Sequence, residues 1–157
     1  MAGYRVVRDA LVATMSAVPN IGVVHAYQRY TGNLSDYLSL FRTTIDGVPQ
    51  IRAWFVTLER TDSRWAAIPP SLAVETRWTF VIYGFLSVDD GSATEETMLE
   101  LTETVMAAIN ASLPTVPGVL MAGPADLRRY DAIVRFGETV THRVTLAVPV
   151  IIDGLAA

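Results

Sequence analysis

Residues 140–152 read VTHRVTLAVPVII, and this stretch decides the class of fold. Large side chains, nearly all apolar, occupy every second position from Val140 to Ile152, and mostly polar or small residues stand between them. An alternation with a period of two predicts a β-strand with one face in a core. Pro149 has no N–H to donate to a neighbouring strand, so we expect that end of the strand to lie at the edge of a sheet.

Further strand patterns precede this one. Residues 132–136 predict a strand that is joined to the last one by a turn around Gly137-Glu138. Residues 51–60 and 74–88 predict a long antiparallel hairpin whose arms project past the body of the sheet. Residues 21–30 predict one more strand. Both faces of the 51–60 strand carry apolar side chains, so each face needs a cover.

Two stretches have helical periodicity. Residues 4–17 repeat apolar side chains at helical spacing before Pro19-Asn20, which stops the helix. Ser92 and Glu95 predict a capping box that starts a second helix. Its apolar stripe consists of Met98, Leu101, Val105 and Ile109. Residues 31–50 predict only one or two helical turns, opened by Asn33 or Ser35 and closed near Asp46-Gly47.

The order of these elements predicts an α+β fold in one domain spanning residues 1–157. It consists of a mostly antiparallel β-sheet with two α-helices packed on one face and a long projecting β-hairpin. A chain of 157 residues is long enough to bury a core without disulfides or metals.

The composition excludes several kinds of chemistry. The chain has no Cys, and all twelve of its positive charges are Arg, so thiol and lysine chemistry are absent. Its net charge of −4 and its dispersed arginines argue against a nucleic-acid-binding protein. The longest apolar run, residues 144–152, is too short to cross a bilayer.

No constellation of residues indicates an active site. His25 and His142, the only imidazoles, each lie in a predicted strand without carboxylates at ligand spacing, so we interpret both as structural or surface residues. The glycines do not form a phosphate-binding loop, and no serine stands in a nucleophile elbow. We therefore expect no catalytic residue, no metal, no cofactor and no enzymatic activity.

Arginines and aromatic residues mark the predicted hairpin as a contact surface, because such residues are enriched at interface hot spots. The alternative for its tip is an ordinary solvated turn. The candidate contacts with a neighbouring subunit or a tube are Trp54, Arg60, Arg64, Trp65, Tyr83 and Phe85.

Three phrases resemble the tail terminator, or tail-completion, proteins of long-tailed bacteriophages and related particles. They are Pro19-Asn20-Ile21-Gly22-Val23-Val24-His25, Ile51-Arg52-Ala53-Trp54-Phe55-Val56, and residues 137–142. The order of elements is similar along nearly the whole chain.

The resemblance implies a virion protein that forms a hexameric ring at the head-proximal end of a tail, assembled in the host cytoplasm and without a membrane. Its partners would be further copies, the tail tube protein and a neck or head-completion protein. DNA would pass through the lumen without specific binding, and a negative lumen would repel its phosphates. Asp89 and Asp90 are the candidate lumen-facing acids, together with the acidic face at residues 95–103.

Two alternatives remain open at this point. A neck or head-closure protein would share the size and the lack of chemistry. A dimeric, small-ligand-binding α+β regulatory domain could present the same order of elements, and it would have a pocket with convergent polar groups.

Overall fold

The computed structural model describes residues 3–65 and 74–153. The elements, in chain order, are α1 (Tyr4–Ser16), β1 (Val23–His25), α2 (Leu34–Ser39), β2 (Arg42–Ile45), β3 (Val48–Trp65), β4 (Val74–Ser87), α3 (Thr94–Ser112), β5 (Val119–Ala122), β6 (Asp126–Phe136) and β7 (Thr139–Asp153), with short 3-10 helices at Asp90–Ser92 and Leu113–Thr115.

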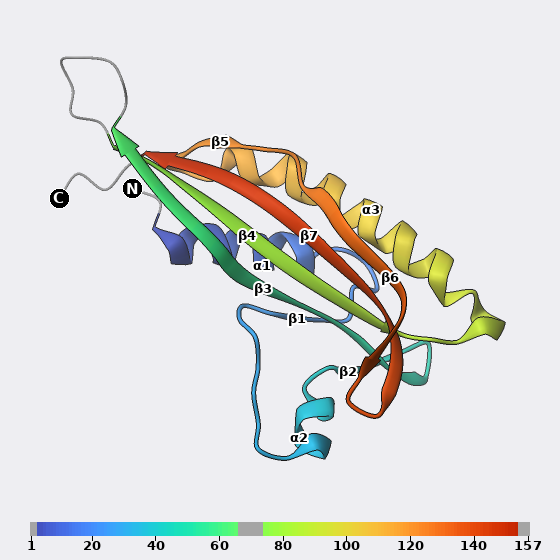
Figure 1. The fold of residues 1–157 in the computed structure, drawn as a ribbon. Coiled ribbons are helices and arrows are strands. Elements are labelled where there is room, and N and C mark those ends of the chain that lie inside the picture. Colours follow the sequence, from blue (N-terminus) through green and yellow to red (C-terminus); the bar gives the residue numbers. More distant parts are fainter. Residues whose placement is uncertain (1–2, 66–73, 154–157) are drawn as a thin grey trace.

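The strands form a seven-stranded sheet with the central path β1-β3-β4-β7-β5. β3, β4 and β7 are long antiparallel neighbours that run side by side along most of the molecule (Figure 1). β1 pairs with β3 in the parallel direction, and β2 pairs with the first residues of β3. β6 and β5 pair with successive parts of β7. The sheet is therefore mixed.

α1 and α3 lie against one face of the sheet, where they cover the main core (Figure 1). Val7, Leu11 and Met15 of α1 are fully buried there at helical spacing. Trp54 of β3 is also fully buried, and its indole N–H donates to the Ile21 carbonyl at 3.1 Å. This bond ties the loop after α1 to the middle of the sheet.

A second cluster of buried side chains, here called the aromatic cluster, lies on the other face of the sheet. It contains Leu38, Phe41, Ile51, Ala53, Phe55, Phe85 and Phe136. The rings of Phe85 and Phe136 approach to 4.5 Å between centroids, within the range of favourable aromatic pairs. α2 supplies Leu38, so this short helix covers the apolar residues that β3 and β4 place on that face.

The predicted fold class is wrong in three respects. The sheet is mixed because β1 is parallel to β3, and the described residues hold a third α-helix, α2, on the face opposite α1 and α3. The hairpin also does not stand free, because β7 pairs with β4 from Ser87 to Glu75. The protein is mostly β, with a curled sheet, and is not an antiparallel sheet with two helices on one face.

Pro149 lies inside the sheet, and not at its edge as we predicted. On one side β7 pairs with β4 past this residue, with Pro149 opposite Thr79. On the other side β6 ends its pairing at Ala147 and β5 begins at Val150, so Pro149 falls in the gap between them. The missing N–H therefore costs no hydrogen bond to a strand.

The capping box at Ser92 is not formed. α3 begins at Thr94, after Ala93, which has a left-handed conformation with φ of 48°. The hydroxyl of Thr94 accepts from the Asp89 N–H at 2.9 Å, and the hydroxyl of Ser92 donates to the Asp89 carboxylate at 2.6 Å. The strand predicted at 21–30 is likewise shorter, because only Val23–His25 pairs with β3.

Candidate interaction surfaces

The second face, meaning the face of the sheet opposite α1 and α3, changes character along its length. At one end it holds the aromatic cluster under α2. Further along β4 the same face carries Val81 and Thr79, and then Arg77 and Glu75 near the strand end. This order follows from the alternation of β4, whose odd positions pass from aromatic to charged residues.

A hollow of about 470 Å³ occupies the middle of the second face. Its lining includes Phe55, Val81 and Tyr83. Arg128 of β6 forms an ion pair with Glu59 of β3, although β4 and β7 separate these two strands. Such a pair can form only if the sheet curls, so the second face is concave.

A cluster of three charges borders this concave face. Asp131 of β6 accepts from Arg143 of β7 at 2.8 Å and from Arg129 of its own strand at 2.9 Å. The bond from Arg143 is the main cause that lowers the pKa of Asp131, and the bond from Arg129 adds to it. Asp131 therefore stays ionised at pH values below those at which an aspartate usually becomes protonated.

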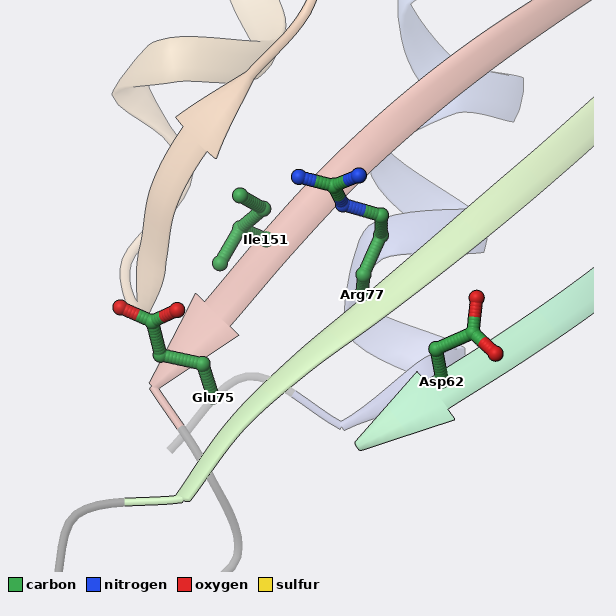
Figure 2. Close-up of a pocket in the computed structure, with 4 residues that line it drawn as sticks. All are labelled: Asp62, Glu75, Arg77 and Ile151. Carbon is green, nitrogen blue, oxygen red and sulfur yellow. The ribbon is translucent and has the colours of Figure 1, made fainter. Parts of the chain in front are cut away.

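The far end of the second face is charged (Figure 2). Asp62 of β3 lies opposite Arg77 of β4, Ile151 of β7 lies on the other side of Arg77, and Glu75 follows on the same face. These four residues line a small hollow of about 100 Å³. Charges of opposite sign alternate here, and such cross-strand pairs stabilise the sheet modestly.

The sheet ends in two open edges. β3 pairs with β4 on one side as far as Trp65, but on its other side β1 reaches only Phe55. We call the unpaired side of β3 beyond Phe55 the β3 edge. β6 pairs only with β7, and its other side is the β6 edge. No strand among the described residues pairs with either edge.

Exposed apolar side chains accompany both edges. Ile133 and Leu127 on β6 are 72% and 38% exposed, and Leu120 and Met121 on β5 are also exposed. Leu58 on β3 is 38% exposed. Exposed apolar residues grouped along an edge are typical of interaction surfaces.

His142 joins three elements beneath the helical layer. Its imidazole is hydrogen-bonded to the Thr94 hydroxyl of α3 at 2.9 Å and to the Ala132 carbonyl of β6. Next to it, burial and then a hydrogen bond to Glu95 raise the pKa of Tyr130 to about 12. His25 is hydrogen-bonded to the Leu40 carbonyl at 2.8 Å. Both imidazoles therefore have structural contacts.

The structure separates the predicted contact residues. Trp54 is fully buried inside the subunit, and Phe85 belongs to the aromatic cluster. Tyr83 is half-buried in the hollow of the second face. Arg60 is exposed on β3 and pairs with Asp62 at 2.7 Å. The interface role of these residues stays a prediction.

The remaining predicted residues are only partly described. The backbones of Arg64 and Trp65 end β3, but their side chains lie outside the described part. Asp89 is exposed in the connection from β4 to α3, and the side chain of Asp90 lies outside the described part. The lumen-facing role of both acids stays a prediction.

Sequence reasoning missed the contribution of β6. Arg129 and Asp131 stand two residues apart, the spacing that puts both side chains on one face of a strand, so this signal was present in the sequence. The partner Arg143 was not foreseeable, because its position depends on how β6 and β7 pair.

Two further observations concern metal sites and membrane spans among the described residues. Within residues 3–65 and 74–153, no group of three acidic or histidine side chains is arranged to hold a metal. Within the same ranges, no helix combines the length and the apolar character needed to cross a membrane.

Comparisons with known proteins give structural similarities but no match at the level of sequence. No protein family matches the sequence, and a search of curated proteins finds no match. Among solved structures, the chain is similar to a chain of a structure titled "Virion of native gene transfer agent (GTA) particle", with a TM-score of 0.43 and 14% identity, covering 97% of this chain and 100% of that chain.

Proposed function

We propose that this protein is a structural component of a phage-like virion and, within that class, a tail terminator. Copies form a ring at the head-proximal end of the tail, stop polymerisation of the tube and offer a surface to the neck. The protein catalyses no reaction in this role. DNA passes through the ring without specific binding.

The observation that carries the proposal is the pair of unlike open edges on one sheet. A contact between the β3 edge of one copy and the β6 edge of the next is heterologous, and heterologous contacts close into rings when the rotation allows it. A dimer with two-fold symmetry would instead use one self-complementary patch.

Two of the phrases that carry the sequence resemblance contact each other in the structure. The phrases at residues 19–25 and 51–56 pack against each other, since Trp54 donates to the Ile21 carbonyl and Arg52 donates to the Asn20 carbonyl at 3.0 Å. A side chain at Gly22 would collide with the backbone of Arg52. The two phrases therefore form one structural unit.

The test is the assembly of the purified protein. Light scattering at several concentrations gives the mass, and negative-stain images show the largest species alone and with tail tubes of the same particle. We expect a closed ring, or a cap at one end of the tubes. A compact dimer that ignores tubes would contradict the proposal and favour the regulatory domain.

A further inference from the structure

We propose that the ring contact is a strand pairing in which residues 58–62 of the β3 edge lie antiparallel to residues 129–133 of the β6 edge of a second copy. In this register Leu58 faces Ile133, Arg60 faces Asp131 and Asp62 faces Arg129. The inference rests on the proposed function and specifies its interface.

Strand directions permit this pairing. β3 is antiparallel to β4, β4 to β7, and β7 to β6, so β3 and β6 run in opposite directions within one subunit. When copies follow one another around an axis close to the strand direction, the β6 edge of one meets the β3 edge of the next in antiparallel orientation. The sheet would then continue from subunit to subunit.

Charge fixes the register. Arg60 and Asp62 lie on the second face, because they stand opposite Thr79 and Arg77 of β4. Asp131 and Arg129 lie on the same face, opposite Arg143 and Thr145 of β7. The proposed register sets Arg60 against Asp131 and Asp62 against Arg129, so each charge meets one of opposite sign across the boundary. A shift by two residues in one direction would set Asp62 against Asp131.

The irregularities of the two strands coincide in the same register. β3 has a bulge between Leu58 and Arg60, and the pairing of β6 with β7 shifts between Asp131 and Val134. Leu58 therefore points to the face of the sheet that α1 and α3 cover, although Arg60 points to the second face. Ile133 also lies on the helical side, in a hollow with Thr94 and His142. The bulges place these two exposed apolar side chains opposite each other.

Side-chain exposure fits a surface that becomes covered. The side chains of Arg60 and Asp62 are 71% and 51% exposed, and that of Arg129 is 64% exposed. Bulges and charges usually protect a strand edge from indiscriminate pairing. Here they allow one partner, a strand with the matching bulge and the opposite order of charges.

Disulfide trapping tests the register directly, because the chain has no cysteine. Opposed residues in an antiparallel pair lie about 4.5–5.5 Å apart between Cα atoms, within the range of about 4.4–6.8 Å that a disulfide spans. We expect the double variant Leu58→Cys with Ile133→Cys to form, on mild oxidation, a ladder of linked subunits that ends at the closed ring. Either single variant should give no species beyond a dimer.

Two matched controls make the trapping specific. Val6→Cys with Ile133→Cys pairs a position on α1 that is at least as exposed as Leu58 with the same β6 residue. Leu58→Cys with Ala132→Cys shifts the register by one residue. Neither control should form the ladder. A ladder that forms equally in these controls, or fails to form in the matched pair while the protein still assembles, overturns the strand pairing but leaves the proposed function. A protein that neither assembles nor caps tubes overturns both.

A charge exchange gives an independent readout. Asp62→Arg sets two arginines against each other, and we expect it to weaken association by up to about fivefold per contact, as the loss of an exposed ion pair allows. Adding Arg129→Asp should restore association. Both side chains are exposed, so we expect the subunit to fold normally with either substitution. A double variant that associates no better than Asp62→Arg alone would contradict the proposed register.

Discussion

Gly84 shows how one missing side chain determines the packing of the main core. It stands directly opposite Trp54 on the neighbouring strand, and a Cβ at this position would collide with the indole ring. The indole is fully buried and is held by its hydrogen bond to the Ile21 carbonyl. The position therefore requires glycine because of the close approach of the ring and not because of its backbone conformation.

Gly84→Ala should destabilise the subunit by about 1–3 kcal/mol, the usual cost of overpacking a core. Chemical unfolding monitored by Trp fluorescence measures the change. If the cause is the collision, Trp54→Leu should make Gly84→Ala nearly neutral in the double variant, although Trp54→Leu alone destabilises by removing buried surface. Equal costs of Gly84→Ala with and without the indole would contradict this explanation.

The ionisation of Tyr130 makes the stability of the protein depend on pH in the alkaline range. Burial and the hydrogen bond to Glu95 raise its pKa from 10.0 to about 12, so the phenol stays protonated in the folded state over a range in which it ionises in the unfolded state. Its contribution to stability is complete below about pH 10 and is lost as the pH rises through about 12.

We expect the melting temperature of the wild type to fall more steeply between about pH 10 and pH 12 than that of Tyr130→Phe, which has no phenol to ionise. Scanning calorimetry over this range measures the difference. The pKa of Tyr37 is also raised, by burial first, but Tyr37 is present in both proteins. Parallel curves for the two proteins would mean that Tyr130 does not titrate as its surroundings imply.

At the scale of elements, strong periodicity made some of the fold predictable. The apolar stripe of α3 and the alternation of β7 are long patterns that depend on local sequence alone, and the structure contains both close to the predicted bounds. β1 was predicted only as part of a longer strand at residues 21–30, and β5 was not predicted. They are short, and their existence depends on pairing with β3 and β7, which lie far away in the sequence.

The second apolar face of the sheet was predicted correctly, but its cover was not. We expected a neighbouring subunit to cover the apolar residues of β3, whereas α2 of the same chain covers part of them. α2 has six residues, and it is preceded by the N-cap Asn33, whose side chain accepts from the Ser35 N–H. Such a short helix is stable only through its packing. Its burial could not be deduced from its weak pattern.

Leu38→Ala should therefore release α2 from the aromatic cluster. Leu38 is the buried residue of this helix, and truncation of a buried leucine costs about 2–5 kcal/mol. Hydrogen exchange should show faster exchange in residues 34–39 and at Phe41, together with lower resistance to urea. Leu34→Ala, at an exposed position of the same helix, is the matched control and should change little. Similar effects of both substitutions would show that α2 is not held through Leu38.

At the scale of the whole molecule, the net charge is concentrated on one helix. α3 holds Glu95, Glu96, Glu100 and Glu103 and no basic residue, so it accounts for −4, and the other twelve acidic residues balance the twelve arginines. The helix dipole favours only the acids of the first turn. Glu100 and Glu103 are exposed further along, so one side of the subunit is acidic.

Two different surfaces could line the channel, depending on whether the acidic side of the subunit or the proposed strand pairing decides the arrangement. We predicted from the sequence that the acids of α3, with Asp89 and Asp90, line the channel. If β3 and β6 edges join, however, the sheet becomes the wall of the ring, and its concave second face turns inward. α3 then lies outside, and the lumen carries the alternating charges of Arg77, Asp62 and Glu75, which also avoid a net attraction for phosphates.

We expect the second arrangement, and thiol labelling with a bulky maleimide tests it. Glu100→Cys on α3 should react equally fast in the assembled protein and in subunits dissociated by dilution. Arg77→Cys is exposed on the concave face of the subunit, so it should react rapidly when dissociated and much more slowly when assembled, because the reagent must enter the channel. Slow labelling of Glu100→Cys with fast labelling of Arg77→Cys in the ring would instead place the acids of α3 at the lumen, where they would repel DNA as first predicted.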